Sequence, residues 1–204
     1  MKRLTASAAV MAGLLATPAL AESSWVYDPV KQQLVSRNDL NQGGGKRYYR
    51  SDKSPIPRRT VAFDAKYAAG TIVVNTGERR LYYSLGNGKA IRYGVGVGRD
   101  GFTWSGTHRV TRKAEWPGWT PPATMIRREA AKGRKLPAYM PGGPDNPLGA
   151  RALYIGSTIY RIHGTNQPWT IGQAMSSGCI RMANEDVTHL YGMADVGTKV
   201  VVIR

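Results

Sequence analysis

Hydrophobic and polar positions after residue 60 alternate in short runs that turns separate. Thr71–Asn75 is rich in β-branched residues. Two further runs, Arg80–Leu85 and Lys89–Val97, flank the dipeptide Asn87-Gly88. Both residues of that dipeptide tolerate positive φ, so the pattern predicts a β-hairpin. The same reasoning predicts four further strands. They are Thr107–Arg112, Arg151–Ile155, Thr158–His163 and Lys199–Ile203.

Helical signals are sparse. One helix is expected from Pro122 to about Lys132, with Gly133 as its C-terminal stop. Another is expected over Glu185–Met193, with Asn184 as N-cap and acidic residues in its first turn. We therefore predict a mainly β fold for residues 59–204, a β-sandwich or barrel with a few short helices.

The start of the chain is typical of a secretory signal peptide, which we assign to residues 1–21. The basic Lys2 and Arg3 precede an apolar or small stretch from Ala6 to Ala16, and Ala19-Leu20-Ala21 supplies a small-x-small cleavage pattern. The apolar stretch is too short for a bilayer span, which needs about 20 residues. We expect export to the periplasm and no transmembrane span in the mature protein.

Residues 22–58 are predicted to be a basic tail or linker. They contain the run Gly43-Gly44-Gly45, and Pro55 and Pro57 precede Arg58-Arg59. Glycine and proline in this density break regular structure, and no helical or strand period is sustained. We therefore expect most of the functional residues to lie within 59–204.

Charge and cysteine count narrow the class of protein. The chain carries 29 Lys and Arg against 13 Asp and Glu, a net charge of +16. Removing Lys2 and Arg3 with the signal peptide lowers it by two, to +14. Such a charge favours a polyanionic partner. Export and the absence of a recognition motif argue against nucleic acid, and favour the anionic cell wall and envelope.

A single cysteine excludes an intrachain disulfide framework and any multi-thiolate metal centre. With only three histidines, a histidine-rich metal site is hard to assemble. We expect no metal and no cofactor.

The cysteine lies in the segment that contains the most candidate reactive residues. His163 ends a predicted strand, Gly164 follows it, and Cys179 comes 16 positions after the histidine, directly behind Gly178. An imidazole within reach can take the proton of a thiol, and a glycine turn leaves backbone amides for an oxyanion. From the residues alone, a buried structural cysteine and a core histidine stay open as the alternative interpretation.

The other two histidines carry a weaker signal. His108 lies on an alternating strand and His189 within a predicted helix. Both are interpreted as structural or surface residues.

This segment resembles the catalytic motif of the L,D-transpeptidase family with the YkuD-type domain. The likeness covers roughly residues 60–204. The matching stretches are His163-Gly164-Thr165, Ser176-Ser177-Gly178-Cys179-Ile180-Arg181-Met182, Asn184, Asp186, 142–153, 116–122 and 79–82.

The resemblance implies the roles of the catalytic residues. Cys179 is the expected nucleophile, His163 its base, and the Gly164 carbonyl the group that orients the imidazole. The amides of Ser177, Gly178 and Cys179 are the expected oxyanion hole.

The resemblance also implies substrate binding at Arg181, Thr165 and Asn146. Arg181 has two open interpretations: it pairs with a substrate carboxylate, or it stabilises the cysteine loop.

The expected activity is acyl transfer on peptidoglycan stem peptides of the diaminopimelate type. A thioester forms on Cys179 with loss of the terminal D-alanine, and an amine of a second stem or of an outer-membrane or envelope protein resolves it. The resemblance also implies acylation by carbapenems. Two alternatives stay open: an L,D-carboxypeptidase or wall-attachment hydrolase that uses water, and a non-catalytic peptidoglycan-binding module.

Overall fold

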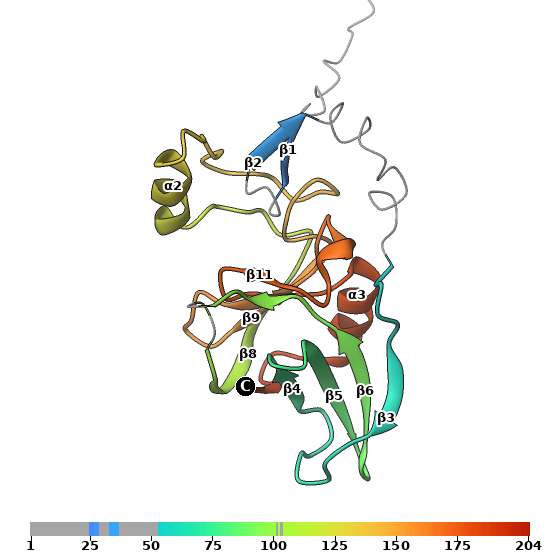
Figure 1. The fold of residues 1–204 in the computed structure, drawn as a ribbon. Helices are drawn as coiled ribbons and strands as arrows, with labels where there is room; N and C mark the ends of the chain where they lie inside the picture. The colour runs from blue at the N-terminus through green and yellow to red at the C-terminus, as the bar shows by residue number, and fades with distance from the viewer. Residues whose placement is uncertain (1–24, 29–32, 37–52, 101, 103) are drawn as a thin grey trace, which may run out of the picture.

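The computed structural model describes residues 25–28, 33–36, 53–100, 102 and 104–204 of the chain (Figure 1). The predicted signal peptide lies outside these residues. The elements are β1 Trp25–Asp28, β2 Gln33–Ser36, β3 Arg59–Ala62, β4 Ile72–Asn75, β5 Arg80–Gly86, β6 Lys89–Gly94, β7 Val97–Gly98, β8 Gly106–Glu115, α2 Ala123–Ala130, β9 Arg151–Ile155, β10 Arg161–His163, the 3₁₀ turn Pro168–Thr170, β11 Ala174–Ser176, β12 Ile180–Arg181, α3 Asn184–Met193 and β13 Lys199–Ile203.

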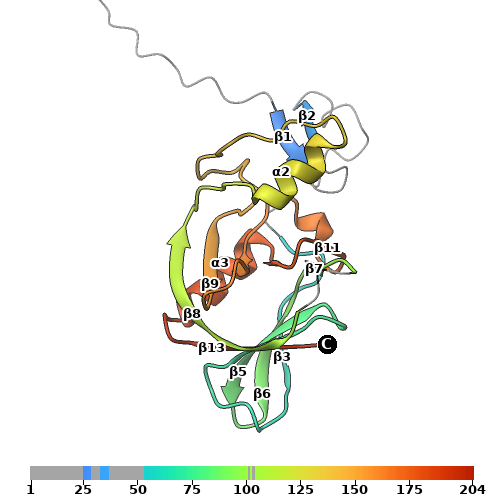
Figure 2. The ribbon, with the colours of Figure 1, turned by 90° about the vertical axis from the view of Figure 1, so that its left-hand side faces the viewer.

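Nine strands form one continuous ladder in the order β12-β10-β9-β8-β13-β4-β5-β6-β3. The long strand β8 joins its two halves, because its first residues pair with β13 and its last residues pair with β9 (Figure 2). A two-stranded parallel pair, β11-β7, lies beside this ladder. The prediction of a mainly β fold with a few short helices is confirmed.

The strands predicted from periodicity are present with small shifts at their ends. The hairpin turn has φ 52° at Asn87 and 71° at Gly88, as its sequence requires. The segment 89–97 is divided: β6 ends at Gly94, and the chain then crosses to pair with β11 as β7. The segment 158–163 is a strand only over β10, because Thr158 caps a turn that comes first.

The predicted linker contains one regular element. The strands β1 and β2 pair in antiparallel fashion, with Val26 opposite Val35. No sustained period marks these strands in the sequence, because four residues are too few to show one. The remainder of 22–52 lies outside the described residues.

A single large core lies between the sheet and α3. Its members are fully buried side chains from both halves of the ladder, including Ile72, Leu81, Leu153 and Ile162. Leu190 of α3 packs against them, and α3 contacts β9. Because this packing buries one face of β9 and β10 in the core, the opposite face of these strands is available for a functional site.

A second, smaller cluster shapes the segment around α2. Trp119, Leu136 and Leu148 form its apolar part. The carboxylate of Glu129 is fully buried there, and its ion partners are the basic groups of Arg128, Lys132 and Arg134 at 3.1, 3.5 and 3.2 Å. A buried carboxylate needs this degree of pairing, so the cluster holds the segment as one folded unit.

Neither of the helices in the described part of the chain has the length and apolar character needed to cross a membrane.

Candidate active site

The pairing of β10 with β12 brings the predicted nucleophile and base to one face of the sheet. The two strands are parallel, with Ile162 opposite Ile180 and His163 opposite Arg181. Both isoleucines point into the core. Because side chains alternate along a strand, His163 and Arg181 point to the opposite face, and so does Cys179, one position before Ile180.

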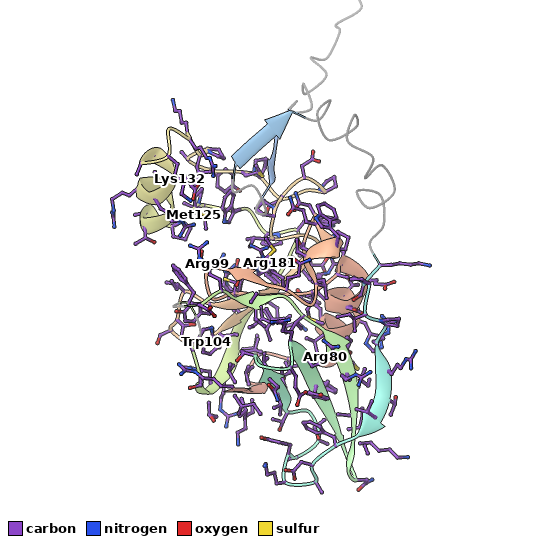
Figure 3. The ribbon with its side chains drawn as sticks, viewed as in Figure 1. Arg80, Arg99, Trp104, Met125, Lys132 and Arg181 are labelled. Atoms are coloured by element: carbon purple, nitrogen blue, oxygen red, sulfur yellow. The ribbon has the colours of Figure 1, made fainter. Side chains whose placement is uncertain are left out.

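These residues line one pocket of about 80 Å³ between the sheet and the α2 segment. Figure 3 labels two of the residues that line it, Met125 on α2 and Arg181 on the sheet. The lining residues are Trp119, Pro122, Met125, Pro147, Leu148, Ile159, Tyr160, Arg161, His163, Ser176, Ser177, Cys179 and Arg181. The pocket therefore holds a partly exposed thiol, an imidazole and two guanidinium groups under an apolar cover.

The imidazole of His163 is buried and held in one orientation. Its Nδ1 lies 2.6 Å from the carbonyl oxygen of Gly164. A carbonyl oxygen only accepts, so Nδ1 carries the hydrogen in this contact, and the backbone of Leu148 is a second hydrogen-bond partner of the ring. Burial, with the positive charges of Arg181 and Arg161 nearby, lowers the pKa of His163 from 6.5 to about 3. The resting imidazole is therefore neutral.

The cysteine loop is shaped by the hydroxyl of Ser176. This buried group donates to the carbonyl of Cys179 at 2.6 Å and accepts from the amide of Gly178 at 3.1 Å. The Gly178 amide, expected in the oxyanion hole, thus donates its hydrogen bond to the Ser176 hydroxyl within the loop. Among the described residues, the amides of Ser177 and Cys179 donate no hydrogen bond to the protein. They are the donors that this loop leaves for a ligand.

Two aromatic residues that the sequence analysis did not select hold the same loop. The Nε1–H of Trp104 donates to the Gly178 carbonyl at 2.7 Å. The Trp104 ring stacks on Tyr160 with centroids 4.7 Å apart and planes at 6°. Gly178 has φ +106°, and a Cβ there would overlap the Tyr160 ring. Local sequence carries no signal for Trp104, since its partner lies far away along the chain.

The expected N-cap role of Asn184 is wrong. The cap position of α3 is Ala183, and Asn184 is the first helical residue. Its buried Oδ1 accepts instead from the amides of Ala150 and Thr165, at 2.9 and 3.2 Å. A buried amide needs a partner more than a solvated helix end does. Asn184 thus ties together the two chain segments that flank the antiparallel pair β9 and β10, one before β9 and one after His163.

The three residues expected to bind substrate lie in different settings. The side chain of Thr165 is buried and caps the amide of Gln167 at 3.1 Å. Both amide hydrogens of the buried Asn146 are used on loop carbonyls, those of Met140 and Pro141 at 3.1 and 2.8 Å. Only Arg181 lines the pocket.

Within the described ranges, His, Cys, Asp and Glu side chains form no group of three or more that could hold a metal ion.

Comparison with known proteins assigns the family. The model of the YkuD family, the L,D-transpeptidase catalytic domain, matches residues 69–202. The chain belongs to this family of acyl-transferring enzymes.

Two relatives come from Escherichia coli K12. The protein named "Probable L,D-transpeptidase ErfK/SrfK" is 44% identical over 137 residues, which cover 65% of this chain and 43% of the relative. The protein named "Probable L,D-transpeptidase YbiS" is 43% identical over 150 residues, 71% of this chain and 47% of the relative. The chain spans about half the length of the curated relatives it matches.

Solved structures show the same fold. An L,D-transpeptidase from Mycobacterium smegmatis superimposes with a TM-score of 0.52 at 17% identity, over 66% of this chain and 58% of the other. At this identity the likeness supports the architecture alone.

Proposed function

We propose that the protein is an exported cysteine L,D-transpeptidase that acts on peptidoglycan stem peptides. The single observation that carries the proposal is the parallel register of β10 and β12, which sets Cys179 and the neutral His163 on one face of the sheet and in one pocket. Family membership supplies the reaction class.

The first half-reaction is acylation of the thiol. Nε2 of His163 takes the proton of Cys179 as the sulfur attacks the carbonyl of the diaminopimelate residue in a donor tetrapeptide. The C–N bond to the terminal D-alanine breaks, and the proton on His163 passes to the leaving amine. A thioester remains on Cys179. Because burial disfavours the imidazolium, His163 holds this proton only in passing.

The second half-reaction is aminolysis of the thioester. An amine attacks, gives its proton to His163, and forms an amide as the thiolate leaves and regains that proton. A thioester is reactive enough to pass its acyl group to an amine without ATP. The amine belongs to a second stem or to an envelope protein.

The developing oxyanion needs two donors. The amides of Ser177 and Cys179 are the groups that fill this role in our proposal, since Ser176 accepts the Gly178 amide. Gly164, through its carbonyl, keeps the tautomer of His163 that the mechanism requires.

We further propose that residues 1–21 are a signal peptide and that the mature chain works in the periplasm. Its charge of +14 suits an anionic wall and envelope. The carbapenem class acylates the same thiol.

The experiment uses the mature protein, a tetrapeptide muropeptide and mass spectrometry of the products. The wild type is expected to release D-alanine and to form 3–3 dimers, whereas Cys179→Ala forms neither. Release of D-alanine without dimers would assign a carboxypeptidase instead. Equal binding of sacculi by both proteins, with no product from either, would assign a binding module.

A further inference from the structure

A row of basic and aromatic side chains crosses the sheet beside the cysteine. Arg161 of β10 pairs with Tyr154 of β9, and Tyr154 pairs with Arg112 of β8. Extending the parallel register of β10 and β12 by one residue sets Arg161 opposite Cys179. Paired residues share a face of a sheet, so the row reads Arg112, Tyr154, Arg161 and Cys179.

The guanidinium of Arg161 lacks the partners that its position calls for. Within the described part of the chain it forms no ion pair, and Nη2 donates one hydrogen bond, to the carbonyl of Ile159 at 3.2 Å. Its Nε is buried and has no hydrogen-bond partner. A buried donor without a partner is costly and calls for an explanation such as an absent ligand.

The Tyr154 ring does not supply that partner. Arg112 lies over it at 3.6 Å from the ring centroid, whereas Arg161 lies at 5.4 Å. Arg112 is exposed and is not among the residues of the pocket, but Arg161 lines the pocket together with Cys179 and His163. Two arginines thus share one ring, and only the one with the unused donor faces the nucleophile.

The chemistry of the donor set selects a carboxylate. A guanidinium presents N–H groups in a planar fork that matches a carboxylate. Neighbouring strands lie about 4.8 Å apart. The carboxylate of a terminal residue lies about 3.5 Å along an extended peptide from the carbonyl before it. A long side chain one strand away from Cys179 therefore reaches the carboxylate of the leaving residue while the sulfur reaches the carbonyl.

The geometry points to Arg161 as the binding site for the terminal carboxylate of the donor peptide. This inference rests on the proposed function and deepens it, because it gives a reason for selecting a stem that ends one residue after the attacked carbonyl. A longer stem places an amide, and no negative charge, at that position.

The test measures binding with the inert Cys179→Ala protein by calorimetry. Its two ligands are the donor tetrapeptide with a free terminal carboxylate and the same peptide ending in a carboxamide. Charge-assisted pairing predicts that the acid binds at least about tenfold more tightly than the amide. Adding Arg161→Gln brings the two affinities within about twofold, by loss of that pairing. Adding Arg112→Gln, which removes the same charge from the other side of the Tyr154 ring, keeps the tenfold preference.

The ratio of affinities separates recognition from structural damage. If Arg161 only supports the fold, Arg161→Gln weakens the acid and the amide equally, and the unchanged ratio overturns the inference. A second variant, Arg161→Lys, keeps the charge and loses the fork, so its preference for the acid is expected between those of Cys179→Ala and the glutamine variant. Equal affinity of Cys179→Ala for both peptides also overturns the inference.

Turnover by the wild type tests the proposed function on its own. No turnover together with tighter binding of the acid by Cys179→Ala would overturn the transpeptidase activity and support the carboxylate site. Turnover of acid and amide at equal kcat/KM would support the activity and overturn the carboxylate site.

Discussion

Replacing Trp104 by phenylalanine removes one hydrogen bond that orients the cysteine loop. The Nε1–H of Trp104 donates to the Gly178 carbonyl at 2.7 Å. That carbonyl and the amide of Cys179 belong to the same planar peptide unit, so fixing one direction fixes the other. Trp104→Phe keeps an aromatic ring against Tyr160 but frees this peptide unit to rotate. We expect the oxyanion donor to lose its alignment.

The size of the effect follows from the environment of the bond. Gly178 is buried, and a buried acceptor that loses its donor costs about 1–3 kcal/mol. If about 1–2 kcal/mol of this is felt in the acyl-transfer transition state, the acylation rate falls about 5- to 30-fold.

The assay compares two reactions of the same sulfur. Acylation of Cys179 by a carbapenem builds an oxyanion, whereas alkylation by iodoacetamide is a displacement that builds none. Rates of both are measured by intact-protein mass spectrometry. Trp104→Phe is expected to lower the ratio of acylation to alkylation about 5- to 30-fold, by the loss of donor alignment just described.

The matched control is Tyr160→Phe. It keeps the ring stack and deletes a hydroxyl that forms no hydrogen bond among the described residues. Its ratio is expected to stay near that of the wild type. An unchanged ratio in Trp104→Phe, or an equal fall in both variants, would refute the role of the indole N–H.

Two further predictions concern His163 and Gly178. Burial lowers the pKa of His163 from 6.5 to about 3. As the pH falls from 6.5 towards 3, the histidine therefore becomes protonated in the unfolded chain but not in the folded one, and the free energy of unfolding decreases. The loss from pH 7 to pH 5 is about 2 kcal/mol, and urea unfolding of His163→Gln at both pH values is expected to lack it. The raised pKa of Asp186, about 6, acts in the opposite direction in both proteins and cancels in the comparison; equal pH slopes would contradict the buried neutral imidazole. Gly178→Ala combines a positive φ with overlap of the Tyr160 ring and is expected to destabilise by about 3 kcal/mol in thermal unfolding. Gly133→Ala, with φ +73° and open space around it, bears only the backbone cost of about 1 kcal/mol, and a difference near zero between the two variants would argue against the ring contact.

Much of the strand order could not be read from the chain, but the strands themselves could. Period-2 runs and the Asn87-Gly88 turn predict the β5–β6 hairpin directly, because the signal is local. The pairing of β10 with β12 joins two short segments in parallel, and short strands carry little period. The division of 89–97 into β6 and β7 could not be predicted either, because the chain can cross to another strand without interrupting the alternation of hydrophobic and polar residues.

A candidate site can be predicted from the sequence where residue type alone suggests the chemistry. Cys179 and His163 were selected from the segment that carries them. The settings of Trp104, Asn184 and Ser176 depend on contacts between distant parts of the chain, which no local pattern encodes. Asn184 is the clearest case: its residue type suits a helix cap, and burial between two amides overrides that preference.

In the proposed reaction, Cys179 carries the acyl group of the donor stem. Intact-protein mass spectrometry of the mature protein, quenched in acid after mixing with a tetrapeptide muropeptide, measures this directly. We predict an adduct equal to the donor less its terminal D-alanine, located on the peptide that contains Cys179 and absent from Cys179→Ala. D-alanine release by the wild type with no adduct at any time point, or the same adduct in Cys179→Ala, would contradict it.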